Sequence, residues 1–171
     1  MDTVFAHEDL ALESLEPAGV RKVFEVWQEG AAGRPFCPRA NFRAERLGAD
    51  LYRVMLVERG SVDGTGFRLR LTGAAIEDPR IGLRNGGLVE SIKPAVYRDY
   101  LLHWYRSAFA APAPAYHSVQ GRIQGQPLEY RRLTLPMSVG GEHCDLLLVA
   151  VHKTRAPLRP HDRLNQQAAR M

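Results

Sequence analysis

The stretch 146–151 reads LLLVAV and limits the possible folds more than any other part of the chain. Six successive apolar residues have the length of a strand, and their side chains alternate between the two faces of a sheet. A strand that is apolar on both faces needs a packed layer on each side. We expect the helix at 94–109, with the loose segment before it, to form one cover. The N-terminal helix, or the same surface of a second subunit, forms the other.

Two earlier segments predict an antiparallel hairpin. Residues 67–72, FRLRLT, alternate apolar and basic side chains, as in a half-buried strand. Residues 50–59, DLYRVMLVER, are rich in strand-forming side chains. The connecting sequence GSVDGTG is typical of a hairpin turn.

Three further strands are predicted in the second half of the chain, at 115–123, 127–137 and 143–152. The sequence GQ joins the first pair and SVGGE the second, so all three form a meander. Together with the hairpin they give one five-stranded antiparallel sheet.

Two amphipathic helices are predicted. In the first, over residues 17–30, an apolar stripe at i, i+3, i+4 and i+7 could cap the sheet or contact a second subunit; its members are Val20, Val23, Phe24 and Trp27. The second covers residues 94–109, begins at Pro94 and ends before APAPA, because proline cannot continue a helix.

This order of elements predicts an α+β domain with helices on one face of the sheet and an additional N-terminal amphipathic helix. We place the domain at 17–153. Residues 1–16 are acidic and weakly patterned, and we expect a loose lead-in. Residues 154–171 are polar and contain proline, and we expect a flexible tail.

Composition narrows the functional classes. The sequence has no apolar run long enough to span a membrane and no secretory signal pattern, so we expect a cytoplasmic protein. Cys37 and Cys144 lie in no CxxC pair, which excludes a disulfide framework. The net charge of +4 comes from 20 arginines and 3 lysines scattered along the chain, without a basic patch or a reading motif. We therefore expect no specific nucleic-acid binding.

Catalytic and cofactor motifs are missing. The chain has no GxxxxGK[ST], no GxGxxG before a helix, no HExxH, no GxSxG and no zinc-type cysteine pairing. His143 and Cys144 are adjacent on a predicted strand, so they point to opposite faces and do not share a metal easily. We expect no metal, no cofactor and no enzymatic activity.

Several stretches, in this order and spacing, make residues 20–153 resemble the PAS domain. They are VRKVFEVWQEGAAGRPFCPRANF, FRLRLTGAAI and LEYRRLTLPMSVGG. The closest likeness is to the bacterial single-domain PAS family of alphaproteobacteria, a domain of unknown function. Trp27, the strand at 67–72 with Gly73, and the strand from Tyr130 to Ser138 carry the likeness.

The resemblance implies a five-stranded sheet in the order 2-1-5-4-3, whose helical face encloses a ligand cavity. It also implies a sensory or interaction module, with dimer contacts on the other face. The chain departs from the family pattern at EDPRIGLRNGGLVE, where Pro79 breaks the expected short helix. PAS pockets lie under that segment, so the departure bears on the identity of the ligand.

Aromatic side chains with polar tips are the candidates to line such a cavity, because a few polar groups orient a ligand there. They are Tyr100, Trp104, Tyr105 and Tyr130, and plain core packing is the alternative for all four. Four arginines on predicted strands could form a basic patch for an acidic partner if they share one face. They are Arg68, Arg70, Arg131 and Arg132, and a solvated sheet face is the alternative for them.

These observations favour a non-catalytic PAS-like sensory module that binds a small ligand or a signalling protein partner and forms a homodimer. Two alternatives stay open. One is a small α+β enzyme whose acid–base groups are Asp99, His103 or Glu129. The other is nonspecific nucleic-acid binding through the arginines.

Overall fold

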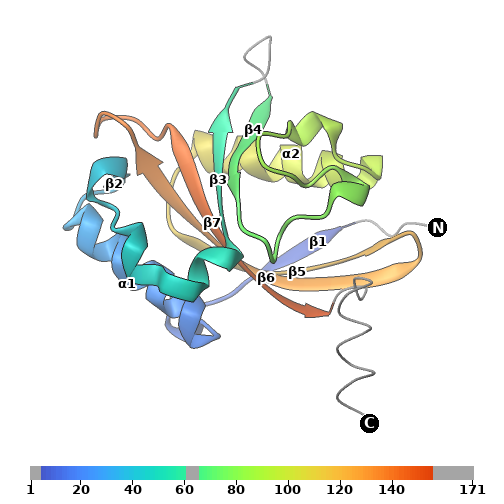
Figure 1. Cartoon of the computed structure of the whole chain (residues 1–171), viewed down its shortest axis with the longest axis horizontal. Helices are drawn as coiled ribbons and strands as arrows, with labels where there is room; N and C mark the ends of the chain where they lie inside the picture. Colours follow the sequence, from blue (N-terminus) through green and yellow to red (C-terminus); the bar gives the residue numbers. More distant parts are fainter. Residues whose placement is uncertain (1–4, 61–65, 156–171) are drawn as a thin grey trace.

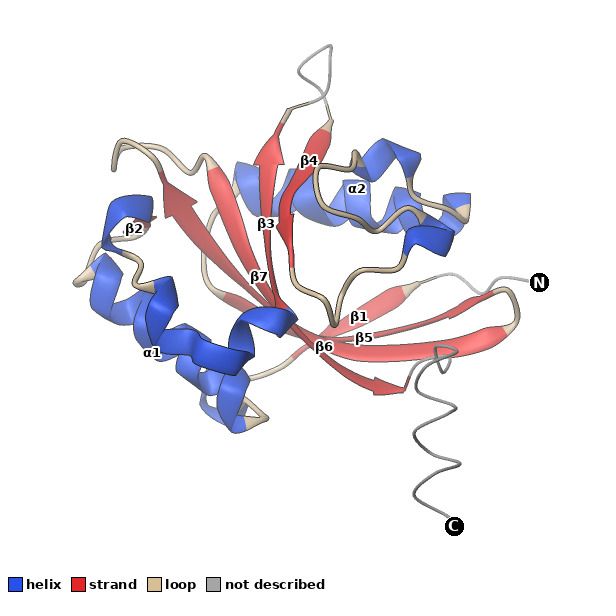
Figure 2. Cartoon of the chain, in the orientation of Figure 1, coloured by secondary structure: helices blue, strands red, loops and turns tan. Residues whose placement is uncertain are grey.

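The computed structural model describes residues 5–60 and 66–155, which form a twisted sheet between two helical layers (Figures 1 and 2). The strands are β1 Ala6–Asp9, β2 Cys37–Pro38, β3 Val54–Arg59, β4 Phe67–Thr72, β5 Ala115–Ile123, β6 Gln126–Ser138 and β7 Leu146–Arg155. The α-helices are α1 Ala18–Ala31 and α2 Ala95–Ala110. The 3-10 helices are η1 Leu12–Ser14, η2 Arg39–Asn41, η3 Ala44–Arg53, η4 Pro79–Ile81 and η5 Val89–Ser91.

The α+β class and the antiparallel sheet agree with the prediction, but the strand count and order do not. The sheet has seven strands in the order β1-β5-β6-β7-β3-β4, and β2 pairs with β6 off this path. All pairs are antiparallel except the two-residue β2, which runs parallel to β6. The difference arises because two short strands are added: β1 on the outer edge of β5, where the sequence predicted a loose lead-in, and the two-residue β2 beside β6.

The predicted hairpin begins later than expected. β4 has its predicted bounds, whereas β3 begins at Val54 because residues 44–53 form η3. An ion pair between Arg53 Nε and Asp50 Oδ1, at 3.2 Å, joins residues three apart and favours the helical turn over the strand. The predicted turn of this hairpin lies largely outside the described residues, as does most of the predicted tail.

Both faces of the sheet are covered by helices, and the N-terminal helix is the cover of the second face, which is one of the two covers expected from the apolar run at 146–151. α2 and the segment containing η4 and η5 pack on one face, over Val57, Leu69 and Val149. α1 and η3 pack on the opposite face, over Leu133, Leu135 and Leu148. β7 contributes to both cores, as the apolar run at 146–151 requires.

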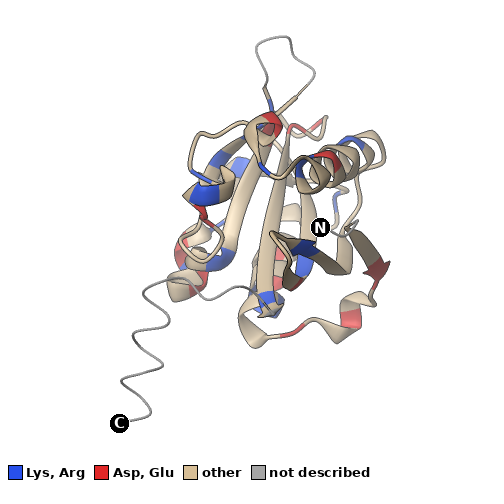
Figure 3. Cartoon of the chain, turned by 90° about the vertical axis from the view of Figure 1, so that its right-hand side faces the viewer, with Lys and Arg blue, Asp and Glu red and all other residues tan. Residues whose placement is uncertain are grey.

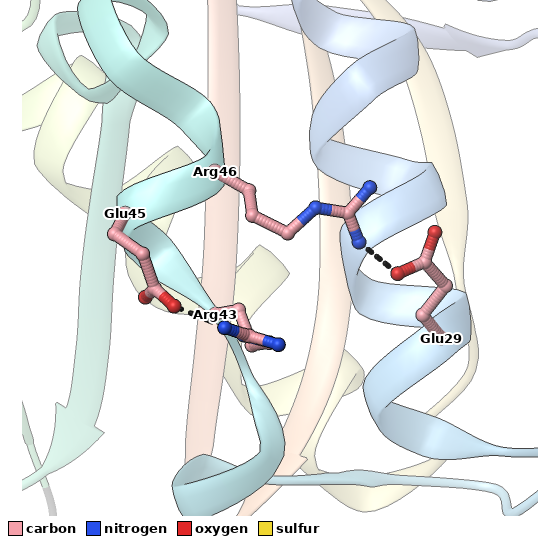
Figure 4. Close-up of polar contacts among 4 residues, drawn as sticks. All are labelled: Glu29, Arg43, Glu45 and Arg46. Atoms are coloured by element: carbon pink, nitrogen blue, oxygen red, sulfur yellow. Dashed lines mark hydrogen bonds and ion pairs between the residues drawn. The ribbon is translucent and has the colours of Figure 1, made fainter.

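α1 is held to the sheet by buried contacts within the same chain. Trp27 Nε1 donates a hydrogen bond to the carbonyl of Pro136 at 2.9 Å. A Cβ on Gly30 would lie 2.6 Å from Cys37 Sγ, so only glycine lets α1 approach the following turn this closely. At the surface, Arg46 pairs with Glu29, and Arg43 pairs with Glu45 at 2.9 Å (Figure 4). Exposed pairs of this kind add little stability.

None of the helices in the described part of the chain is long and apolar enough to cross a membrane. Cys37 is buried, Cys144 is half-buried, and both are free thiols.

Candidate functional site

A cavity of about 120 Å³ lies between α2, the segment around η4 and the α2 face of the sheet. The hairpin of β5 and β6 closes one side of it. Its apolar wall includes Met55, Ile76, Ile81, Leu83, Leu101 and Leu128, and its polar lining includes Tyr97, Tyr105, Tyr130, Arg132, Asp78, Arg80, Gln124, Gln126 and Lys153. The volume is close to that of the roughly 150 Å³ engineered cavity that holds benzene in another protein.

Arg132, on β6, is the most unusual residue in this wall. Its side chain is 1% exposed, and Nη2 lies 3.3 Å from Nδ1 of His117. Nε and Nη1 have no well-oriented hydrogen-bond partner among the described residues, although the hydroxyls of Tyr100 and Tyr130 lie near the guanidinium. No carboxylate of the described chain forms an ion pair with Arg132. A buried charge without a partner is costly, so this guanidinium is prepared to bind an acceptor.

Two of the four aromatic candidates line the cavity, and two lie against Arg132. Tyr105 and Tyr130 belong to the wall. Trp104 and Tyr100 present their ring faces to the guanidinium carbon at 4.5 and 5.5 Å, which offsets part of its charge.

The tyrosine hydroxyls of the cavity remain protonated. Burial is the main cause that raises the pKa of Tyr97, Tyr105 and Tyr130, and it raises that of Tyr100 to about 12. Tyr97 Oη and Tyr130 Oη lie 3.3 Å apart, and buried Tyr105 Oη has no partner among the described residues. These groups can therefore donate hydrogen bonds to a ligand.

Arg132 is linked to the edge strand β1 through His117. His117 Nε2 lies 3.0 Å from Asp9 Oδ1, and His7 Nδ1 lies 3.0 Å from Tyr100 Oη. Burial, followed by the positive charge of Arg132, lowers the pKa of His117 to about 4. Neutral His117 can accept from Arg132 at Nδ1 and donate to Asp9 at Nε2.

His7 and Asp9 of β1, together with His117 of β5, also have the composition of a metal site. Ligand atoms of His7, Asp9 and His117 lie within 4.8 Å of one another. The guanidinium of Arg132, next to His117, disfavours a cation there because like charges repel in a buried setting.

The outer part of the cavity is polar and partly exposed. Arg80 Nε and Nη2 donate to the two carboxylate oxygens of Asp78 at 2.9 and 3.0 Å. Burial acts to raise the pKa of Asp78, but the hydrogen bonds and charge of Arg80 hold it below its ordinary value. Asp78 is thus already occupied by a cation and does not neutralise Arg132.

The three residues proposed as acid–base groups of an enzyme do not lie together in the structure. Asp99 is exposed and pairs with Arg98 at 2.9 Å, and His103 is exposed on the same helix. Glu129 follows Leu128 and precedes Tyr130 on β6, so its side chain points to the opposite face of the sheet. These three groups form no common apolar pocket.

The α1 stripe is used within the chain. Val20, Val23 and Trp27 are buried against the sheet, and Phe24 is half-buried and stacks on Trp27 at 6.1 Å. The first three side chains therefore act as a cap on the sheet.

The four strand arginines do not share a face. Arg68 and Arg70 are exposed on β4, and Arg131 pairs with Glu16 at 3.5 Å. Arg132 points the other way, into the cavity. Figure 3 shows basic and acidic residues interspersed in the view that it draws.

The role of Arg132 was missed because a run of two arginines was interpreted as surface. One signal was available: Tyr130 and Arg132 are two apart on a strand and must share a face. A tyrosine predicted to line a cavity therefore places the arginine beside it.

We compared the chain with family models, with curated proteins and with solved structures, and none of them matches. Its function must therefore be argued from the cavity itself.

Proposed function

We propose that this chain is a non-catalytic, cytoplasmic, PAS-like sensory module that binds a small ligand in the cavity between α2 and the sheet. One observation carries the proposal: a ligand-sized cavity contains buried Arg132, whose Nε and Nη1 lack partners in the described chain. Small-molecule sites combine apolar walls with a few polar groups in this way.

The order of the strands supports the PAS-like part of the proposal. When β1 and β2 are set aside, the remaining strands are neighbours in the order β4-β3-β7-β6-β5. Numbered along the chain from β3, this is the 2-1-5-4-3 order that the resemblance implies. The cavity also lies under the segment between β4 and α2, where PAS pockets lie.

Sensing requires that a ligand favour one of two states of the protein. Two elements border the ligand site and lead to the surface. The segment containing η4 contributes Ile76, Ile81 and Leu83 to the wall. β1 is connected to Arg132 through His117 and Asp9. A ligand that engages Arg132 would stabilise both in their present positions.

Native mass spectrometry of the freshly purified full chain tests the proposal. We expect a non-covalent adduct with the mass of a small organic molecule, which is lost on denaturation. The same spectrum measures the predicted homodimer. A ligand-free spectrum, combined with no thermal stabilisation by any member of a small-molecule library, would overturn the proposal.

A further inference from the structure

Each buried polar group of the cavity can donate a hydrogen bond, and the guanidinium of Arg132 can only donate. Arg132 has only N–H groups, and the buried tyrosines remain protonated, with Tyr105 Oη unpartnered in the described chain. The hydroxyls of Tyr97 and Tyr130 use one hydrogen between them and leave the other to donate. A ligand that satisfies this site must therefore supply acceptors.

The charge of the cavity wall restricts the chemical class of the ligand further. The inner wall carries one fully buried cation, Arg132, with no paired carboxylate among the described residues. The guanidinium contacts His117 through Nη2, which has a second N–H. Nη2 together with either Nε or Nη1 can thus donate two parallel hydrogen bonds. This planar fork matches a carboxylate.

The aliphatic part of the cavity wall limits the size and polarity of the rest of the ligand. Aliphatic side chains from β3, the η4 segment, α2 and β6 surround the space, and the volume of about 120 Å³ suits a body near the size of benzene. A dianion such as phosphate matches the inner wall poorly, because its second charge would be buried among aliphatic groups, whereas the other cations of the lining, Arg80 and Lys153, are partly exposed to solvent.

We propose that the ligand is a small organic monocarboxylate, with its carboxylate on the guanidinium of Arg132 and its apolar body against the aliphatic wall. This inference rests on the proposed function and specifies the chemical class of the ligand. Tyr105, and the Tyr97–Tyr130 pair, donate further hydrogen bonds to the carboxylate end.

Titration calorimetry on the full chain tests the inference with matched pairs of ligands. Benzoate and hexanoate are compared with benzamide and hexanamide, which have the same bodies without the charge, and with inorganic phosphate. The variants are Arg132→Met, Arg132→Lys and Tyr105→Phe. Arg131→Gln is the control, because Arg131 is the neighbouring residue on the opposite face of β6.

We expect at least one carboxylate to bind about tenfold or more tightly than its amide, since the amide loses the charge-assisted contact. Arg132→Met should weaken carboxylate binding by about tenfold to a hundredfold. Arg132→Lys should weaken it less, because the charge stays and the fork is lost. Tyr105→Phe should cost about threefold to tenfold, and Arg131→Gln should leave binding unchanged.

Different failures have different meanings. Amides that bind as tightly as their acids, or an Arg132→Met protein that retains carboxylate affinity, would overturn the carboxylate inference and leave the ligand cavity standing. Phosphate that displaces benzoate would overturn the carboxylate class. No binding of either acid or either amide would overturn the inference and count against the proposed function as well. Should Arg132→Met fail to fold, Arg132→Lys and Tyr105→Phe decide the outcome.

Discussion

We expect Arg132 to lower the stability of the ligand-free fold. Its charge is buried, and its contacts include the imidazole of His117, the ring faces of Trp104 and Tyr100, and the nearby hydroxyls of Tyr100 and Tyr130. Ring faces offset part of the cost of removing a guanidinium from water, but they supply no acceptor for Nε or Nη1. Retaining such a residue is physically reasonable if a ligand provides the missing acceptor.

The first prediction follows from this cost. Arg132→Met in the ligand-free protein should raise the free energy of unfolding by about 1 kcal/mol, because a buried unpaired charge is replaced by an apolar side chain. Urea denaturation monitored by circular dichroism measures it. A loss of more than about 2 kcal/mol would show that Arg132 serves stability instead of ligand binding.

His117 gives a second prediction at this scale. Its pKa in the folded chain is about 4, whereas an unfolded histidine titrates near 6.5. As the pH falls from about 6.5 to 4, the unfolded chain gains a proton that the folded chain does not bind, so the free energy of unfolding decreases. His117→Gln should remove this part of the decrease.

The charged and titratable groups that face His117 are Arg132 from β6, and His7 and Asp9 from β1. They are unchanged in His117→Gln, so the difference between the two stability curves reports the loss of His117 together with its electrostatic contacts to these groups. Urea midpoints measured from pH 7.5 to pH 4 provide both curves. Parallel curves would contradict the low pKa.

At the scale of elements, β1 is the part of the fold that sequence patterns did not predict. β1 is only four residues long, and its sequence AHED is mostly polar and poor in strand-forming side chains. β1 forms because it pairs with β5, and because Phe5 packs on Gly121 and on Tyr97, whose ring centroid is 4.5 Å away. These contacts join residues more than 90 positions apart, which no local pattern reveals.

The third prediction tests how β1 is held. A Cβ on Gly121 would overlap the ring of Phe5, so Gly121→Ala should destabilise the chain by about 1–3 kcal/mol. A double-mutant cycle with Phe5→Ala, measured by urea denaturation, supplies the control. In the Phe5→Ala background the same glycine change should cost much less, because the overlapping ring is gone. If Gly121→Ala destabilised both backgrounds equally, the added Cβ would not be in conflict with the ring of Phe5.

The elements that were predicted well have strong local patterns. The sequence of β4 alternates, although a register shift against β3 leaves Leu71 exposed and Thr72 buried. α1 has a continuous apolar stripe, and α2 is bounded by prolines. Alternation on β6 could also have placed Arg132 beside Tyr130. The depth of Arg132 could not be predicted, because it depends on α2 covering the sheet and on β1 extending beside β5.

At the scale of the whole molecule, Arg132 is a buried group that borders two surface elements, the segment containing η4 and, through His117, the strand β1. The fourth prediction is that saturating benzoate slows amide hydrogen exchange in residues 73–92 and in β1, because bound ligand restrains the wall and the His117–Asp9 connection. α1 lies on the opposite face and should exchange at an unchanged rate. Arg132→Met should abolish the effect.

Hydrogen exchange followed by mass spectrometry measures these rates. If benzoate did not slow amide exchange in residues 73–92, or if it still slowed exchange in Arg132→Met, the proposed connection from the ligand to the surface would be contradicted.

The central claim, that Arg132 anchors an organic carboxylate, is tested most directly by a crystal structure of the chain with bound benzoate. We predict both carboxylate oxygens within hydrogen-bond distance, about 2.7–3.2 Å, of guanidinium nitrogens of Arg132. The ring should lie against the aliphatic wall formed by Ile76, Leu83 and Leu101. Benzoate bound away from Arg132, or a cavity in which only water contacts the guanidinium, would contradict the claim.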